Sequence, residues 1–132
     1  MSLPRSIDRS DLGGATVSVP TTTETVILTG PNLQTPKDTS VLAIIASLSM
    51  VQGTGATGLT LRLRLGSAVT GTQVGQPYVV TTPSSIQTLS VSFVITFAAY
   101  STDYVQVCLT AQQTAASGNG NVTAAALLAI SF

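Results

Sequence analysis

The sequence predicts an all-β domain, a jelly-roll-like β-sandwich of about eight antiparallel strands with an extended N-terminal arm. Apolar and polar residues alternate along several segments of strand length, which is the period of a sheet that buries one face. Gly, Pro, Asn and Ser, the usual turn formers, separate these segments. No convincing helical period is present, and no fixed repeat suggests a propeller or a β-helix.

Composition limits what this domain can do on its own. The chain has 132 residues, enough for one domain, and only 8% of them are charged, where about 25% is typical of soluble domains. The formal net charge is +0, and a surface so poor in charge promotes association. We therefore expect neighbouring subunits to cover much of it. A secreted or adhesin-like surface rich in Thr and Ser is the alternative.

The first fourteen residues differ from the rest. Four of the ten charges lie between Arg5 and Asp11, and the stretch ends at Gly13-Gly14. Without an apolar period it reads as an arm, so we divide the chain into an arm (1–14) and a sandwich (15–132). The arm either docks on a partner or folds back on its own domain. The first possibility makes it a partner-binding segment with six predicted contact residues: Leu3, Arg5, Ile7, Asp8, Arg9 and Asp11.

The first half of the sandwich begins with two short predicted strands, Ala15 to Val19 and Glu24 to Thr29. A loop from Gly30 to Thr39 follows, punctuated by two prolines. Ser40 to Gln52 is apolar on both faces, which predicts a long strand buried on both sides. A helix is the competing interpretation, but Val and Ile enrichment and the GTGATG turn that follows favour a strand.

Gly58 to Gly66 alternates most regularly. One face carries Leu59, Leu61, Leu63 and Leu65 and is predicted to be buried, and the other carries Thr60, Arg62 and Arg64. Two arginines so close together suggest an intersubunit contact to carboxylates or carbonyl groups, because Arg bonds directionally. A solvated sheet face is the other interpretation.

The second half contains four further predicted strands: Gln76 to Thr81, Ile86 to Phe97, Asp103 to Gln113 and Asn121 to Phe132. In two of these strands alternation predicts inward-facing rows, made of Leu89, Val91, Phe93, Ile95 and Phe97 in one and Val105, Val107 and Leu109 in the other. The SGNGN stretch suits a tight hairpin turn.

Catalytic chemistry has little support. The chain has no His, the commonest general base and metal ligand. The carboxylates are scattered (Asp8, Asp11, Glu24, Asp38 and Asp103), and Cys108 has no His partner. We therefore expect no enzyme activity, no metal and no cofactor. Five cations matched by five acids argue against nucleic acid. The start lacks a secretory apolar stretch and no apolar run could span a bilayer, so we expect no membrane partner and synthesis in a reducing host cytoplasm.

Three stretches, LTLRLRLGSAVTGTQVG, SVSFVITF and the closing NVTAAALLAISF, resemble trimeric jelly-roll domains of the TNF/C1q-like type. Versions of these domains occur in bacteriophage head-decoration (cement) proteins and fibre knobs. The resemblance implies a homotrimer that binds a major capsid protein or another virion component on the outer capsid surface. The alternative function is a ligand- or receptor-binding knob of a fibre or another surface appendage.

Overall fold

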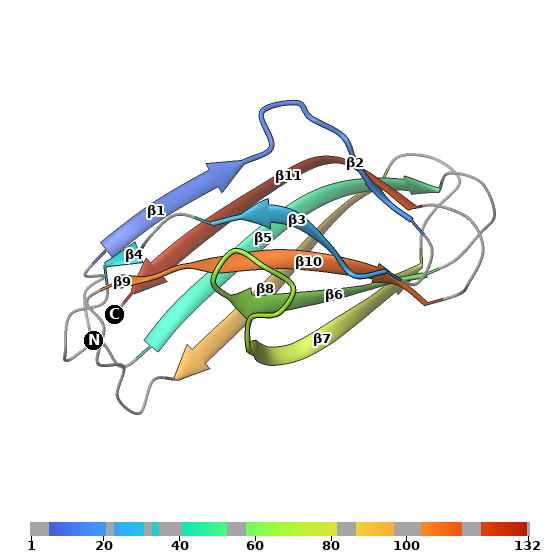
Figure 1. Ribbon diagram of the computed structural model, residues 1–132. Coiled ribbons are helices and arrows are strands. Elements are labelled where there is room, and N and C mark those ends of the chain that lie inside the picture. Colours follow the sequence, from blue (N-terminus) through green and yellow to red (C-terminus); the bar gives the residue numbers. More distant parts are fainter. Residues whose placement is uncertain are drawn as a thin grey trace.

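The computed structural model describes residues 6–20, 23–30, 33–34, 41–52, 58–81, 87–96, 104–114 and 120–131, and these form two antiparallel sheets packed face to face (Figure 1). What we call the first sheet contains β1 (Ser6–Asp11), β2 (Val17–Val19), β11 (Gly120–Ser131), β5 (Val41–Gln52) and β8 (Gln87–Thr96). The second sheet contains β3 (Thr25–Thr29), β10 (Val107–Gln113), β6 (Gly58–Leu65) and β7 (Gln73–Thr81). A short ladder joins β4 (Leu33–Gln34) to β9 (Tyr104–Val105).

The strand order is that of a jelly roll. β1 and β2 both pair with β11, so together they make one interrupted edge strand. If they count as the first of eight strands, and the β4–β9 ladder is set aside, the sheet orders become 1-8-3-6 and 2-7-4-5. First pairs with last, second with seventh, third with sixth and fourth with fifth, as in a long hairpin rolled onto itself. The predicted fold class is therefore confirmed.

The core lies between the two sheets, and the described residues that form it are aliphatic apart from Met50. Leu59, Leu61 and Leu63 of β6 are fully buried, as predicted, while Leu65 at the strand end is half-buried. The first sheet contributes the alternate residues of β5 and β11: Ile44, Ala46, Leu48, Met50, Val122, Ala125, Leu127 and Ala129. Each Leu buried in this way stabilises the fold by about 1.5–3 kcal/mol.

Within the single chain, the stretch predicted to be buried on both sides, Ser40 to Gln52, is buried on one side only. In β5, Ile44, Ala46 and Leu48 point into the core, but Ile45 between them is 45% exposed. A two-layer sandwich gives each sheet one inner face, and none of the described segments lies over the other face of β5 at Ile45. Both faces are nonetheless short of charge, which is why the sequence pattern suggested burial.

β10 is the strand that is buried on both sides. Val105, Val107 and Leu109 are buried, as predicted, but Cys108 and Thr110 on the opposite face are also fully buried. The segment 66–72 between β6 and β7 folds back over this outer face (Figure 1), where the carbonyl of Ala68 lies 3.8 Å from the Cys108 thiol.

The predicted arm is an element of the sandwich in its described part. Ser6–Asp11 forms β1 and pairs with β11 from Ser131 to Ala126, so this segment folds back on its own domain. Its charges suit a sheet edge, where they discourage pairing with foreign strands. Gly13 and Gly14 adopt positive φ (61° and 87°) and the Asp11 carboxylate accepts from the Gly13 amide at 2.8 Å, which turns the chain from β1 toward β2.

Two side chains tie the sheets together. The buried amide of Gln113 on β10 donates to the carbonyl of Val19 on β2 at 2.6 Å, and the hydroxyl of Tyr78 on β7 donates to the carbonyl of Ser92 on β8 at 2.7 Å. The inward row predicted for Ile86 to Phe97 falls on side chains outside the described residues. Nowhere in the described ranges is there a helix of the length and apolar character that a membrane span needs.

Candidate functional site

The outer face of the first sheet is the most unusual surface of the domain. Strand register shows which side chains share it, because directly paired residues point to the same side. Arg9, Leu128, Ile45 and Ser92 form one row across β1, β11, β5 and β8. The next row is Asp11, Ala126, Ser47 and Ser90, and Ala124 and Ser49 follow in the row after that.

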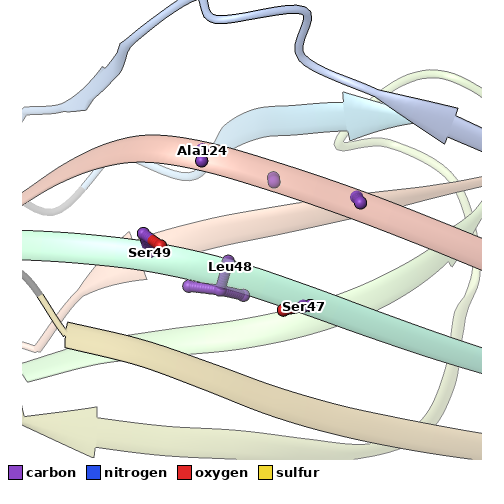
Figure 2. Close-up of a pocket in the computed structure, with 6 residues that line it drawn as sticks. Ser47, Leu48, Ser49 and Ala124 are labelled. Carbon is purple, nitrogen blue, oxygen red and sulfur yellow. The ribbon is translucent and has the colours of Figure 1, made fainter.

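The side chains of this face differ in size from row to row. The first row contains the large side chains of Ile45 and Leu128. Beside them lies a depression of about 320 Å³ that Arg9, Ser47 and Ala126 also line. A second depression, of about 160 Å³, lies where the side chains are smallest (Figure 2), over Ser47, Ser49, Ala124 and Ala126. We call the row of Arg9, Leu128, Ile45 and Ser92 the large row. The row of Asp11, Ala126, Ser47 and Ser90 is the small row.

Charge lies only at one margin of the described part of this face. Arg9 and Asp11, both exposed, lie on the edge strand β1, and the rest of the two rows is apolar or carries hydroxyl groups. Ile7, 59% exposed, extends the apolar surface along the same strand. The arrangement can contact another uncharged surface while two opposite charges fix its position.

Part of the outer face of the second sheet, around Arg64 and Cys108, is covered by the chain itself. The Arg64 guanidinium binds both carboxylate oxygens of Glu24, with Nε–Oε1 at 2.6 Å and Nη2–Oε2 at 2.8 Å. Its third nitrogen donates to the carbonyl of Gly71 at 3.0 Å, which holds the segment 66–72 against the sheet. The Thr110 hydroxyl donates to Glu24 at 2.5 Å. A bidentate pair of this kind is directional as well as strong.

The electrostatics of this network follow from its geometry. Hydrogen bonding from Arg64 lowers the pKa of Glu24, against the opposing effect of burial. Burial raises the pKa of the Cys108 thiol, which lies beneath the same segment. A thiol with a raised pKa and no exposed surface is unreactive. The network therefore fixes a loop and shields a cysteine.

The two arginines predicted as a pair have different partners. The guanidinium of Arg64 binds Glu24 and the carbonyl of Gly71 within its own chain. Arg62, half-buried, donates to the side chain of Gln112 at 2.8 Å. Both interpretations offered for Arg64 overlooked that Glu24, forty residues earlier in sequence, borders the same face once β3, β10 and β6 pair.

The predicted partner-binding residues are thus divided among several places. Leu3 and Arg5 lie outside the described residues. Ile7, Arg9 and Asp11 share the outer face of β1, and Asp8 points to the opposite side of that strand. The sequence reasoning missed Ile45, Leu128 and the small residues beside them. The signal was present in the stretch 40–52, which is apolar on both faces, but was taken for burial.

Among the residues that the structure describes, no three His, Cys, Asp or Glu side chains lie close enough to hold a metal ion.

Comparison with known proteins places the fold. No protein-family model and no curated protein matches the sequence. Among solved structures, that of infectious bursal disease virus Gx strain matches 99% of this chain at 15% identity and a TM-score of 0.65. The VP2 subviral particle of the same virus matches 98% of the chain, also at 15% identity, with a TM-score of 0.64.

These likenesses show that the chain has the jelly-roll sandwich of those viral proteins. The match covers 33% of each viral chain, so this chain spans about a third of their length. A weaker match, with a TM-score of 0.47 and 14% identity, is to the C-terminal domain of EclA, described as a sugar-binding protein.

Proposed function

We propose that this protein is a structural subunit of a virus particle. The observation that carries the proposal is the difference between the two outer faces. On the second sheet, the outer face around Cys108 is covered by the segment 66–72, which Arg64 holds while it also pairs with Glu24. The first sheet leaves Ile45 and Leu128 beside an open depression, with charge at one margin. An apolar face of this kind is expected to be covered by another subunit.

The fold likeness supports the same conclusion. Two solved structures of this fold come from a virus particle, and the similarity extends over nearly the whole of the present chain. The viral chains are about three times longer, so their remaining parts have no counterpart here. We propose a decoration or cement role on the outer capsid surface, with the major capsid protein as partner.

The proposal includes self-association and the absence of catalysis. The resemblance of the sequence to trimeric jelly rolls supports a homotrimer. A non-enzymatic role is supported by the engagement of Glu24 with Arg64 and Thr110, because their hydrogen bonds lower the pKa of Glu24 and so make this carboxylate a weaker base.

The rival function, a ligand- or receptor-binding knob, has weaker support. Aromatic side chains that stack on sugars are the usual mark of such a site. Tyr78 is the exposed aromatic residue within the described side chains, at 38%, and its hydroxyl already bonds to Ser92 across the edge of the sandwich.

The test uses particles stripped of the protein, from the same source as the sequence. Wild-type protein is expected to sediment with them, and Ile45→Asp, which places a charge on the open face, is expected to bind much less. Val79→Asp is the matched control. Val79 is 70% exposed, and because it pairs with Thr60 it lies on the outer face of the second sheet.

Equal loss of binding in both variants, or none in either, contradicts the role assigned to the face. Failure of the wild-type protein to bind particles, together with binding to a carbohydrate array, would favour the rival function.

A further inference from the structure

The two rows of the first sheet are complementary to each other. In the large row Arg9, Leu128 and Ile45 lie side by side, and in the small row Asp11, Ala126 and Ser47 occupy the same three strands. Each position of the small row is two residues along its strand from its counterpart, or roughly 7 Å. On β1 a positive side chain therefore lies next to a negative one, and on β11 and β5 a large side chain lies next to a small one.

We propose that a second copy of this chain packs face to face on this surface, about a two-fold axis that runs perpendicular to the strands between the two rows. This inference rests on the proposed function, because that function requires another subunit to cover the outer face of the first sheet. It adds the identity of the occupant, the symmetry of the contact and the residues that set its register.

This symmetry follows from the geometry of the face. Two copies of one surface meet face to face only if the two-fold axis lies in the plane of contact. With the axis across the strands, each strand faces its own copy and the row order is reversed. Leu128 then faces Ala126, and Ile45 faces Ser47, so that the standing side chains of each copy enter the low region of the other.

The other in-plane axis fits poorly. An axis parallel to the strands between β11 and β5 preserves the row order and places Ile45 of one copy against Leu128 of the other, with Ala126 against Ser47. Large side chains would then meet large ones, and the depression over the small residues would stay empty. Stacked sheets pack about 10 Å apart and tolerate few voids, which favours the axis across the strands.

The charges at the margin agree with the same axis. It sets Arg9 of each copy against Asp11 of the other, which forms two equivalent ion pairs. Among the described residues the Arg9 guanidinium has no ion-pair partner in its own chain. The Asp11 carboxylate accepts one backbone amide, that of Gly13, and has further acceptor capacity.

The experiment is a charge exchange, read as mass by sedimentation velocity over a range of protein concentrations. Wild-type protein should show a concentration-dependent doubling of mass, from one chain to two or, if a trimer forms through another surface, from three chains to six. Arg9→Asp or Asp11→Arg should each weaken this doubling by at least about tenfold, because two attractions become two repulsions. The double variant R9D/D11R should restore it.

Two further arms sharpen the result. An equimolar mixture of Arg9→Asp and Asp11→Arg proteins should form mixed pairs, because one presents two acids and the other two arginines. Asp8→Arg is the matched control: it changes net charge as Asp11→Arg does, on the same strand, but on the opposite side. It should leave the doubling unchanged. Raising the salt concentration should weaken the wild-type contact without any substitution.

The inference is overturned if the wild-type mass never doubles, if the single variants double as wild type does, or if the double variant and the mixture fail to recover. Particle sedimentation is measured separately. Particles that still bind Arg9→Asp protein, with no wild-type doubling, would refute the two-fold contact and leave the proposed function standing.

Discussion

Truncating Leu63 to Ala tests the sandwich core where it is most tightly enclosed. Leu63 is fully buried and lies in the second sheet between Leu109 of β10 and Val74 of β7. Strands on both sides restrict collapse around the hole, so the cost belongs within the range of about 2–5 kcal/mol known for such truncations. A domain of 132 residues has an unfolding entropy of about 280 cal/mol/K, so about 3 kcal/mol lowers the melting temperature by about 11 °C.

The assay is thermal unfolding followed by far-UV circular dichroism at one protein concentration. Leu65→Ala is the matched control, because Leu65 ends the same leucine row but is only half-buried. Its melting temperature should fall by less than half as much. Equal shifts in the two variants, or a shift below about 2 °C for Leu63→Ala, would show that the core does not lie where the alternation and the structure place it.

Three further predictions concern the edge strand and the covered part of the outer face of the second sheet. Glu24→Gln should lower the melting temperature at pH 7, and the difference from wild type should shrink as pH falls below the ordinary value of 4.5, because the pKa of Glu24 is lowered in the fold and its stabilisation is lost when it protonates. Deleting residues 1–12 should lower the melting temperature more than deleting residues 1–5 does, because only the longer deletion removes β1 and exposes the edge of β11. Gly71→Ala should expose Cys108 to a thiol reagent, because a Cβ there would lie 1.8 Å from the Leu65 carbonyl oxygen.

Each of these has a contrary result. A constant gap between Glu24→Gln and wild type from pH 7 to 3 would mean that the charge of Glu24 does not contribute to stability. Equal melting of the two deletions would mean that Ser6–Asp11 is not part of the sandwich. Thiol labelling of Gly71→Ala at the wild-type rate would mean that the segment 66–72 is not what shields Cys108.

The fold was predictable because it depends on local patterns. Period-two alternation in Gly58 to Gly66 sets which side of β6 is buried, and Gly, Pro and Asn mark the turns. The predicted strand bounds agree with the observed ones to within a few residues, as for Gly120–Ser131. The long strand β7 was predicted too short, because its first residues lie in a glycine-rich stretch that also supplies the preceding turn.

The candidate site was less predictable because it depends on long-range pairing. Nothing in the sequence near Arg64 indicates Glu24, which reaches it only through the order β3-β10-β6. The edge strand β1 lacks an apolar period, because an edge tolerates charge on both sides. The open face of β5 could not be told from a buried one, since its residues, such as Ala43, Ile45 and Ser47, are as free of charge as those of an interior.

The central claim about the outer face of the first sheet, that a second copy of this chain covers it, is tested most directly by the mass of the wild-type protein and of Ile45→Asp in solution. Ile45 stands on that face 45% exposed, and its substitution should leave the fold intact. Sedimentation equilibrium should show self-association of the wild-type protein at micromolar concentration and its marked weakening in Ile45→Asp, with both proteins melting alike. Identical masses for the two proteins would contradict the account.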